Sequence, residues 1–138
     1  MYVDDDADDR DLVREIFDEF SNIIELLTFE DGFSLLNYLD TLVPLQPKPC
    51  LIVIDINMPR LDGKQLLRKI RGRDDFNEVP AVLFSTSTLP ADAIFAQTHN
   101  AGFITKPLHN SQVYLIVDQL IEHCTDDVKE RIKKQRGR

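Results

Sequence analysis

The feature that most limits how this chain can fold is a short apolar run that ends in a carboxylate. Residues 50–54 (CLIVI) are apolar without interruption, and Asp55 follows at once. A brief run rich in Ile and Val is typical of a strand that is covered on both faces, as in a parallel sheet. Ligand sites in such sheets lie just outside the carboxyl ends of the strands. We therefore expect a buried strand that presents Asp55 at a functional edge.

The remainder of the chain alternates between strand and helix patterns. Strands are expected at residues 1–3, 23–29, 50–55, 81–84 and 102–105, and helices at residues 8–20, 33–42, 66–72, 90–99 and 113–121. Apolar residues recur at helical spacing in the helical segments, and Gly or Pro stands at several of their ends. Five such alternations with short connections predict right-handed crossovers and a parallel sheet with helices on both faces.

Length and charge limit the classes of protein to which the chain can belong. Its 138 residues are expected to form one domain. Its 24 acidic and 16 basic residues give a formal net charge of -8, which argues against a nucleic-acid partner. No apolar run approaches the roughly 20 residues that cross a bilayer, so we expect no membrane partner and a soluble, cytoplasmic protein. Cys50 and Cys124 are far apart in sequence, and we interpret both as reduced structural thiols.

Polar side chains stand at the points where four of the predicted strands end. They are Asp4 and Asp5, Asp55, Ser85 and Lys106. Because the carboxyl ends of parallel strands meet at one edge of a sheet, we expect these side chains to converge. Three converging carboxylates raise one another's pKa unless a cation lies between them, and Mg2+ prefers such oxygen ligands. A phosphoryl group on Asp55 would then be held by the metal, by the Lys106 ammonium and by the Ser85 hydroxyl.

These motifs together resemble the receiver domain of two-component response regulators. Asp4 and Asp5, the segment 54–59 (IDINMP), Ser85 and the pair 106–107 (KP) occur in the order of that family, each at the expected strand end. The resemblance covers about residues 1–124. Residues 125–138 are expected to form a C-terminal helical extension or basic tail, and we interpret them as a solvated extension of the last helix rather than a binding patch.

The resemblance implies a flavodoxin-like (βα)5 fold, a doubly wound parallel sheet of five strands in the order 2-1-3-4-5. It also implies a phosphorylation switch in which Asp55 accepts a phosphoryl group from a sensor histidine kinase or a phosphotransfer protein. Asp5 and Asp55 would bind Mg2+ (or Mn2+) directly, Asn57 would bind it through the backbone carbonyl, and Asp4 would act through water. Such a domain assists its own phosphorylation and dephosphorylation, and it is not expected to be an enzyme that acts on a separate substrate.

The same resemblance implies roles for three further features. Lys106 and Ser85 would hold the phosphoryl oxygens, and Ser85 would move toward them on activation. Phe103 stands where the family places its switching aromatic ring, here without the hydroxyl of the commoner Tyr. Phosphorylation would bias the face formed by the fourth helix, the fifth strand and the fifth helix, where a homodimer would also form. The peptide bond between Lys106 and Pro107 is expected to be cis.

A second similarity is to the single-domain regulators that are paired with phytochrome-type kinases. It is carried by residues 85–88 (STST), by the loop 74–77 (DDFN) and by the helical tail. No output domain follows the receiver segment in this sequence. We therefore expect a stand-alone regulator that signals through protein contacts.

Two alternatives from other classes of protein remain open. A phosphohydrolase of the haloacid-dehalogenase type also uses an Asp at a strand end with Mg2+, but it needs a second acid two residues later, where this chain has Asn57. The other alternative is a receiver-like binding module that works without phosphorylation. The presence of Asp4, Asp5, Ser85 and Lys106 beside Asp55 argues against it.

Overall fold

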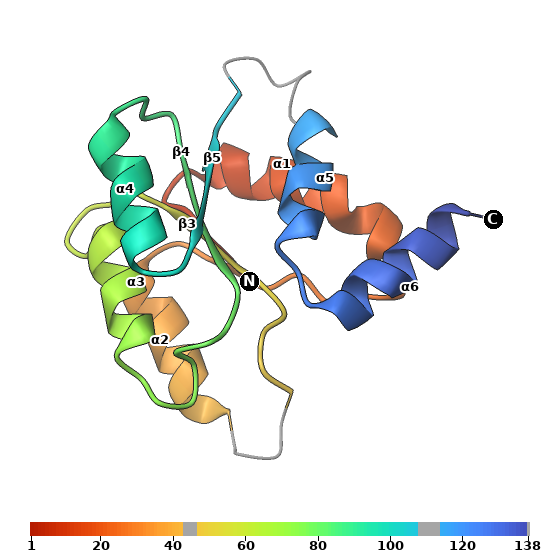
Figure 1. The fold of residues 1–138 in the computed structure, drawn as a ribbon, viewed down its shortest axis with the longest axis horizontal. Coiled ribbons are helices and arrows are strands. Elements are labelled where there is room, and N and C mark those ends of the chain that lie inside the picture. Colours follow the sequence, from red (N-terminus) through yellow and green to blue (C-terminus); the bar gives the residue numbers. More distant parts are fainter. Residues whose placement is uncertain (43–46, 108–113, 138) are drawn as a thin grey trace.

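The fold was obtained as a computed structural model, and it describes residues 1–42, 47–107 and 114–137. Within these residues the strands form a five-stranded sheet in the order β2-β1-β3-β4-β5, and every neighbouring pair is parallel (Figure 1). The predicted flavodoxin-like topology, with its strand order 2-1-3-4-5, is confirmed.

The five predicted alternations of strand and helix are present, and a 3-10 turn and a sixth helix are added to them. The strands are β1 (Tyr2–Val3), β2 (Thr28–Phe29), β3 (Ile52–Asp55), β4 (Ala81–Ser85) and β5 (Gly102–Thr105). The helices are α1 (Ala7–Phe17), the 3-10 turn η1 (Asp18–Phe20), α2 (Gly32–Thr41), α3 (Gly63–Arg71), α4 (Pro90–Thr98), α5 (Tyr114–Glu122) and α6 (Asp126–Arg136). Residue 113, the expected start of the fifth helix, lies outside the described residues.

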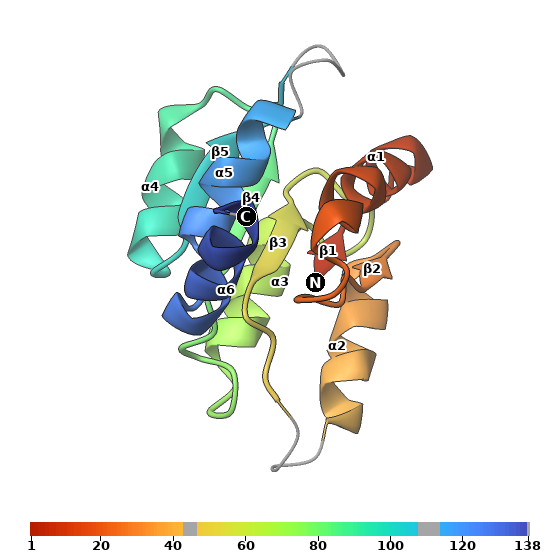
Figure 2. The same cartoon turned by 90° about the vertical axis from the view of Figure 1, so that its right-hand side faces the viewer.

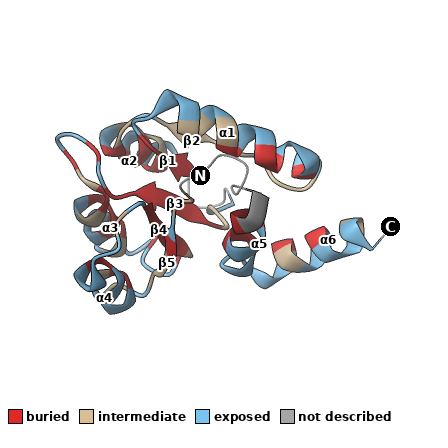
Figure 3. Cartoon of the chain, turned by 90° about the horizontal axis from the view of Figure 1, so that it is seen from above, coloured by how far each residue is buried: buried red, intermediate tan, exposed pale blue. Residues whose placement is uncertain are grey.

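Helices cover both faces of the sheet, so the protein has two apolar layers. Figures 1 and 2 show α2, α3 and α4 on one face and α1 and α5 on the other. Seen from above, the buried strands lie between these layers (Figure 3). Successive residues of a strand point to opposite faces, which is why Tyr2 packs in one layer and Val3 in the other.

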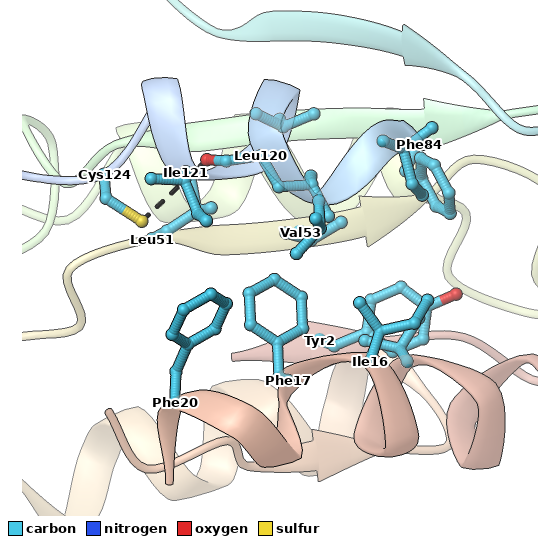
Figure 4. Packing of buried hydrophobic residues seen from close by; sticks show 14 of the residues in the cluster. Tyr2, Ile16, Phe17, Phe20, Leu51, Val53, Phe84, Leu120, Ile121 and Cys124 are labelled. Carbon is cyan, nitrogen blue, oxygen red and sulfur yellow. Dashed lines mark hydrogen bonds between the residues drawn. The ribbon is translucent and has the colours of Figure 1, made fainter. Parts of the chain in front are cut away.

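Each layer is one cluster of buried side chains. The α1–α5 cluster includes Tyr2, Val13, Ile16, Phe17, Phe20, Val53, Phe84, Leu120 and Ile121 (Figure 4). The α2–α4 cluster includes Val3, Leu35, Leu39, Ile54, Leu66, Leu67, Ile70, Leu83 and Ala96. Burying one such large apolar side chain stabilises the fold by about 1.5–3 kcal/mol. The two clusters therefore fix the strand ends that carry the polar residues.

The second strand is shorter than the sequence predicts. β2 contains only Thr28 and Phe29, whereas an extended segment was expected from residue 23. The backbone N–H groups of Ile23 and Ile24 both donate to the Phe20 carbonyl, at 2.8 and 2.9 Å, so the chain continues in turns after η1. Their side chains pack against the α1–α5 cluster from this turn, which satisfies the apolar pattern without a strand.

The interpretation of the tail as a solvated extension of the last helix is wrong. A turn at residues 123–125 separates α5 from α6, so α6 is a helix of its own. Val128 and Ile132, one helical turn apart, are buried in the α1–α5 cluster. The Gln135 side chain donates to the Glu19 carbonyl at 2.7 Å. The many charges of this segment concealed the short apolar stripe that docks it.

The Lys106–Pro107 peptide bond and the two cysteines were also subjects of prediction. The described residues contain no cis peptide bond, so the cis bond expected between Lys106 and Pro107 is wrong, and the trans form is the one that an X–Pro bond favours by about 0.5–1 kcal/mol. Both cysteines are free, with Cys124 buried and Cys50 half-buried against the same cluster. Among the described residues no helix is long and apolar enough to cross a membrane.

Candidate functional site

The sheet brings the first and third strand ends side by side. In the parallel register Val3 lies opposite Ile54, so Asp4 follows next to Asp55. Both aspartates are buried, whereas Asp5 is exposed. The three carboxylates offer oxygens that lie within 4.8 Å of one another.

The segment after β3 is held close against the strand by a glycine. A side-chain Cβ at Gly63 would lie 2.2 Å from the carbonyl oxygen of Asp55, and the Gly63 N–H donates to the Ile56 carbonyl at 2.8 Å. Asp62 caps α3, and it exchanges hydrogen bonds with Gln65 in a capping box. This turn into α3 keeps the loop with Asn57 beside Asp55.

Lys106 extends from the end of β5 into the group of carboxylates. Its Nζ lies 2.7 Å from Asp4 Oδ2, 3.1 Å from Asp55 Oδ1 and 3.2 Å from Asp9 Oδ2. Three carboxylates thus contact this one ammonium, and Asp5, close to the Asp4 and Asp55 carboxylates, adds a fourth negative charge to the group. The surroundings therefore favour an additional cation.

Asp4 is fixed by several donors. Its Oδ2 accepts from the Tyr2 hydroxyl at 2.5 Å as well as from Lys106, and its Oδ1 accepts from the Asp6 N–H at 3.0 Å. Figure 4 shows the Tyr2 ring in the α1–α5 cluster with its hydroxyl at the edge where the strands end. A carboxylate has about four acceptor positions, so Asp4 retains little capacity for direct metal binding. This favours the predicted contact of Asp4 through water.

The pKa values of these groups reflect burial and an excess of negative charge. Burial raises the pKa of Asp55 to about 7, because the Lys106 ammonium only partly offsets it and Asp4 adds repulsion. Burial also opposes ionisation of Asp4, but hydrogen bonds from Lys106 and Tyr2 lower its pKa below the ordinary value. Burial acts against the Lys106 ammonium, yet its pKa is raised by Asp4 and Asp55. Thus Asp55 is the carboxylate that most needs a further cation.

The oxygen-only donor set of Asp4, Asp5 and Asp55 fits a hard divalent cation. Such ions take carboxylate, carbonyl and water oxygens as ligands, and Mg2+ commonly uses one or two carboxylates. Asn57 is exposed and lies two residues beyond Asp55, and the part assigned to its carbonyl remains a prediction.

The remaining predicted residues lie on β4 and β5. Ser85 is the last residue of β4 and is fully buried. It follows Phe84, which pairs with Asp55 in the sheet. Its Oγ accepts a hydrogen bond from the Ser87 N–H at 3.1 Å. Phe103 is half-buried in β5 and packs against the α2–α4 cluster. The switching roles of Ser85 and Phe103 remain predictions.

Three residues around the site were not predicted from the sequence. Asp9, an acid in the first turn of α1, contacts Lys106. The Arg10 guanidinium donates to the backbone carbonyl of Asp4 at 2.7 Å. Tyr2 is the third. The signal available for it was a polar aromatic residue two positions before Asp4, which directly follows β1, because alternate residues of an extended segment share a face.

Comparison with known proteins decides the family. Residues 1–118 match the family model of the response regulator receiver domain. The chain belongs to this family. Its two-component signalling function and its receiver fold follow from this membership, and the haloacid-dehalogenase alternative is set aside.

Individual relatives agree with this family assignment. The chain is 28% identical to the response regulator Rcp1 of Synechocystis over 85% of this chain and 82% of that protein. It is 34% identical to the two-component response regulator ARR17 of Arabidopsis thaliana over 82% of this chain and 78% of the relative.

Two solved structures are also similar to this receiver. The Mn(2+)-bound form of Rcp1 superimposes with a TM-score of 0.74 at 28% identity, covering 86% of this chain and 87% of Rcp1. The phosphorylated cyanobacterial phytochrome response regulator RcpA gives a TM-score of 0.80 at 27% identity, covering 91% and 92% of the two chains.

Proposed function

We propose that this receiver accepts a phosphoryl group on Asp55 from a histidine kinase or a phosphotransfer protein, and that a divalent cation, Mg2+ or Mn2+, is required. An Asp55 carboxylate oxygen attacks the phosphorus, the bond from phosphorus to the donor nitrogen breaks, and an aspartyl phosphate forms. The observation that carries this proposal is the meeting of Asp4, Asp5, Asp55 and Lys106 at one edge of the sheet.

Each residue of the site has a proposed task in this transfer. Lys106 already contacts Asp55, and its ammonium would pair with an oxygen of the incoming phosphoryl group. Ser85 would donate its hydroxyl to another oxygen. Asp4 accepts from this ammonium and from the Tyr2 hydroxyl, and it would so help to keep the ammonium at the strand end.

The metal would be held directly by Asp5, Asp55 and the Asn57 carbonyl, and through water by Asp4. When bound, it would neutralise the charge that develops on the phosphoryl oxygens. The excess of carboxylates over ammonium groups supports this part of the proposal, as does the Mn(2+) in the structure of Rcp1. The domain would in this way assist its own phosphorylation and dephosphorylation without acting on a separate substrate.

The signal would leave through the face formed by α4, β5 and α5, where Phe103 lies. A homodimer through this face, a phytochrome-type kinase as partner and a cytoplasmic location remain predictions. We also propose that residues 1–124 form the receiver unit and that residues 125–138, with α6, form an extension docked on it. Burial of Val128 and Ile132 supports docking.

A labelling experiment tests the proposed function. The protein is incubated with acetyl phosphate with and without Mg2+, the acyl phosphate is reduced with borohydride, and the modified peptide is identified by mass spectrometry. We expect modification of Asp55 only in the presence of the metal. No modification under any condition would contradict the proposal and favour the phosphorylation-independent binding module. Modification elsewhere would contradict the assignment of Asp55.

A further inference from the structure

One buried carboxylate lies outside the phosphoryl site. Four polar residues are buried among the described residues, and three of them, Asp4, Asp55 and Ser85, belong to the strand ends. The fourth is Asp92 in the first turn of α4, which is 5% exposed. A buried carboxylate that the phosphoryl chemistry does not use requires another explanation.

Asp92 joins two helices and a loop. Its Oδ1 forms an ion pair with the Lys64 ammonium of α3, and its Oδ2 accepts from the Ser87 hydroxyl in the loop between β4 and α4. Lys64 Nζ also lies 5.4 Å from the ring centroid of Phe95 in α4. These partners lower the pKa of Asp92, Lys64 contributing most, so the carboxylate is charged at neutral pH.

The contacts continue from Asp92 to the phosphoryl site. The Ser87 hydroxyl donates to Asp92 and also accepts from the N–H of Leu89, the residue just before α4, at 3.2 Å. The Ser87 N–H donates to Ser85 Oγ at 3.1 Å. One series of hydrogen bonds thus runs from α3 through Asp92 to the hydroxyl that is proposed to hold the phosphoryl group.

We propose that Lys64, Asp92 and Ser87 form a latch, with Asp92 as its positioning residue, that keeps Ser85 and the β4–α4 loop in the arrangement adopted before phosphorylation. This proposal rests on the proposed function, in which Ser85 moves toward a phosphoryl group on Asp55. The latch acts through Ser85, so Asp92 is not a catalytic residue.

The latch is expected to shift an equilibrium between two arrangements of the β4–α4 loop. A set of contacts that is stronger in one arrangement than in the other biases the protein toward the first. If the latch holds the arrangement that precedes phosphorylation, each productive binding of a phosphoryl group must overcome it. Removing the latch should therefore strengthen the binding of a phosphoryl mimic. A merely structural contact would lower stability and leave that affinity unchanged.

Two measurements on the full chain test the latch. Hydrogen–deuterium exchange of residues 86–92 reports on the loop in the absence of any ligand. Titration with beryllofluoride and Mg2+, followed by fluorine NMR, reports the affinity for a non-covalent mimic of the phosphoryl group. The variants are Asp92→Asn, Ser87→Ala and Lys64→Met, with Asp126→Asn as the matched control. Asp126 is also an acid in the first turn of a helix, but its side chain is 97% exposed.

We expect Asp92→Asn and Ser87→Ala to speed exchange in the loop and to lower the dissociation constant for beryllofluoride by about fivefold. Lys64→Met should change both in the same direction but less, and Asp126→Asn should change neither. Faster exchange with an unchanged or weaker affinity would overturn the proposal. If Asp92→Asn does not fold, as judged by its melting curve, Ser87→Ala decides, because it removes one half-buried hydroxyl and no charge.

Failure of the proposed function is distinguishable from failure of the latch. If the unaltered protein binds no beryllofluoride and takes no phosphate, the proposed function fails and the latch with it. If the unaltered protein binds the mimic and the variants bind it equally well, only the latch fails.

Discussion

Asp55 and Asp92 are both buried aspartates, but their electrostatic surroundings differ. At the sheet edge Asp55 shares the Lys106 ammonium with Asp4 and Asp9, and burial raises its pKa to about 7. Between α3 and α4, Asp92 pairs with the Lys64 ammonium, which no second carboxylate in the described part of the chain is shown to share, and accepts from the Ser87 hydroxyl. These two partners lower its pKa.

The comparison shows that burial alone does not identify a functional carboxylate. The negative charge of Asp92 is balanced by the positive charge of Lys64, so this carboxylate needs no further cation and can serve to position other groups. Several carboxylates around one ammonium keep an excess of negative charge, and this excess favours a mobile divalent cation. The balance between carboxylates and cations therefore separates the sheet edge from the contact between α3 and α4.

The largest expected difference comes from replacing each aspartate by the asparagine of the same shape. Asp55→Asn removes the proposed attacking oxygen, so labelling by acetyl phosphate should fall at least about 100-fold. Asp92→Asn should still be labelled, because it lies outside the reacting groups. Intact-mass measurement of both variants with Mg2+ checks this. Undiminished labelling of Asp55→Asn would contradict the proposal that Asp55 accepts the phosphoryl group and Asp92 does not.

Replacing each lysine by methionine tests the charge balance. Lys106→Met leaves buried Asp4 without its ammonium, so the free energy of unfolding should fall by about 2–4 kcal/mol. Lys64→Met should cost about 1 kcal/mol, because Lys64 is partly exposed and Asp92 keeps the Ser87 hydroxyl. Urea unfolding measures both. Adding Mg2+ should recover stability in Lys106→Met and not in Lys64→Met, and equal recovery in both would contradict the comparison.

The raised pKa of Asp55 predicts the pH dependence of stability without metal. Its value rises from 3.8 in the unfolded chain to about 7, so between these values the folded state holds a proton that the unfolded state has released. This contribution to stability is present at low pH and is lost as the pH rises through about 7.

Mg2+ should therefore raise the melting temperature by several degrees more near pH 8 than near pH 5, where protons and metal compete for Asp55. Calorimetry of the unaltered protein and Asp55→Asn measures this difference. It should shrink in Asp55→Asn and persist in Asp92→Asn. An equal Mg2+ effect at both pH values would count against the assignment of Asp55 to the metal.

The smallest expected effects come from removing one hydroxyl donor at each site. Tyr2 donates to Asp4 beside the proposed metal site, and Ser87 donates to Asp92 in the latch. Tyr2→Phe removes the donor to Asp4 and keeps the ring in the α1–α5 cluster. The loss of this one hydrogen bond should lower the free energy of unfolding by about 1 kcal/mol, measured by urea unfolding. Ser87→Ala removes the donor to Asp92 and should cost a similar amount. Mg2+ affinity should fall in Tyr2→Phe alone, since only Tyr2 orients a residue of the proposed metal site.

The alternation of apolar segments was sufficient to predict the sheet, its parallel strands and the residues at their ends. Each strand is short and bounded by Gly, Pro or a charged residue, so a period of two or a continuous apolar run is easily recognised. The end of the apolar run at Asp55 is the clearest case. Segment 23–29 failed because Ile23 and Ile24 reach the apolar layer from a turn, and apolar composition alone does not separate these two possibilities.

What the sequence could not predict are contacts between residues far apart in the chain. Asp92 looks like an ordinary acid in the first turn of a helix, and only the packing of α3 on α4 gives it Lys64 as a partner. The docking of α6 depends on Val128 and Ile132 meeting a surface formed by other helices. In both cases the local pattern allows an exposed segment, and tertiary packing decides otherwise.

The central claim is that the excess of carboxylates at the sheet edge is a divalent-cation site, and anomalous diffraction from crystals soaked in Mn2+ tests it most directly. We predict one strong anomalous peak among the carboxylates of Asp4, Asp5 and Asp55, and no peak at Asp92. A peak at Asp92, or none between Asp5 and Asp55 at saturating Mn2+, would contradict the claim.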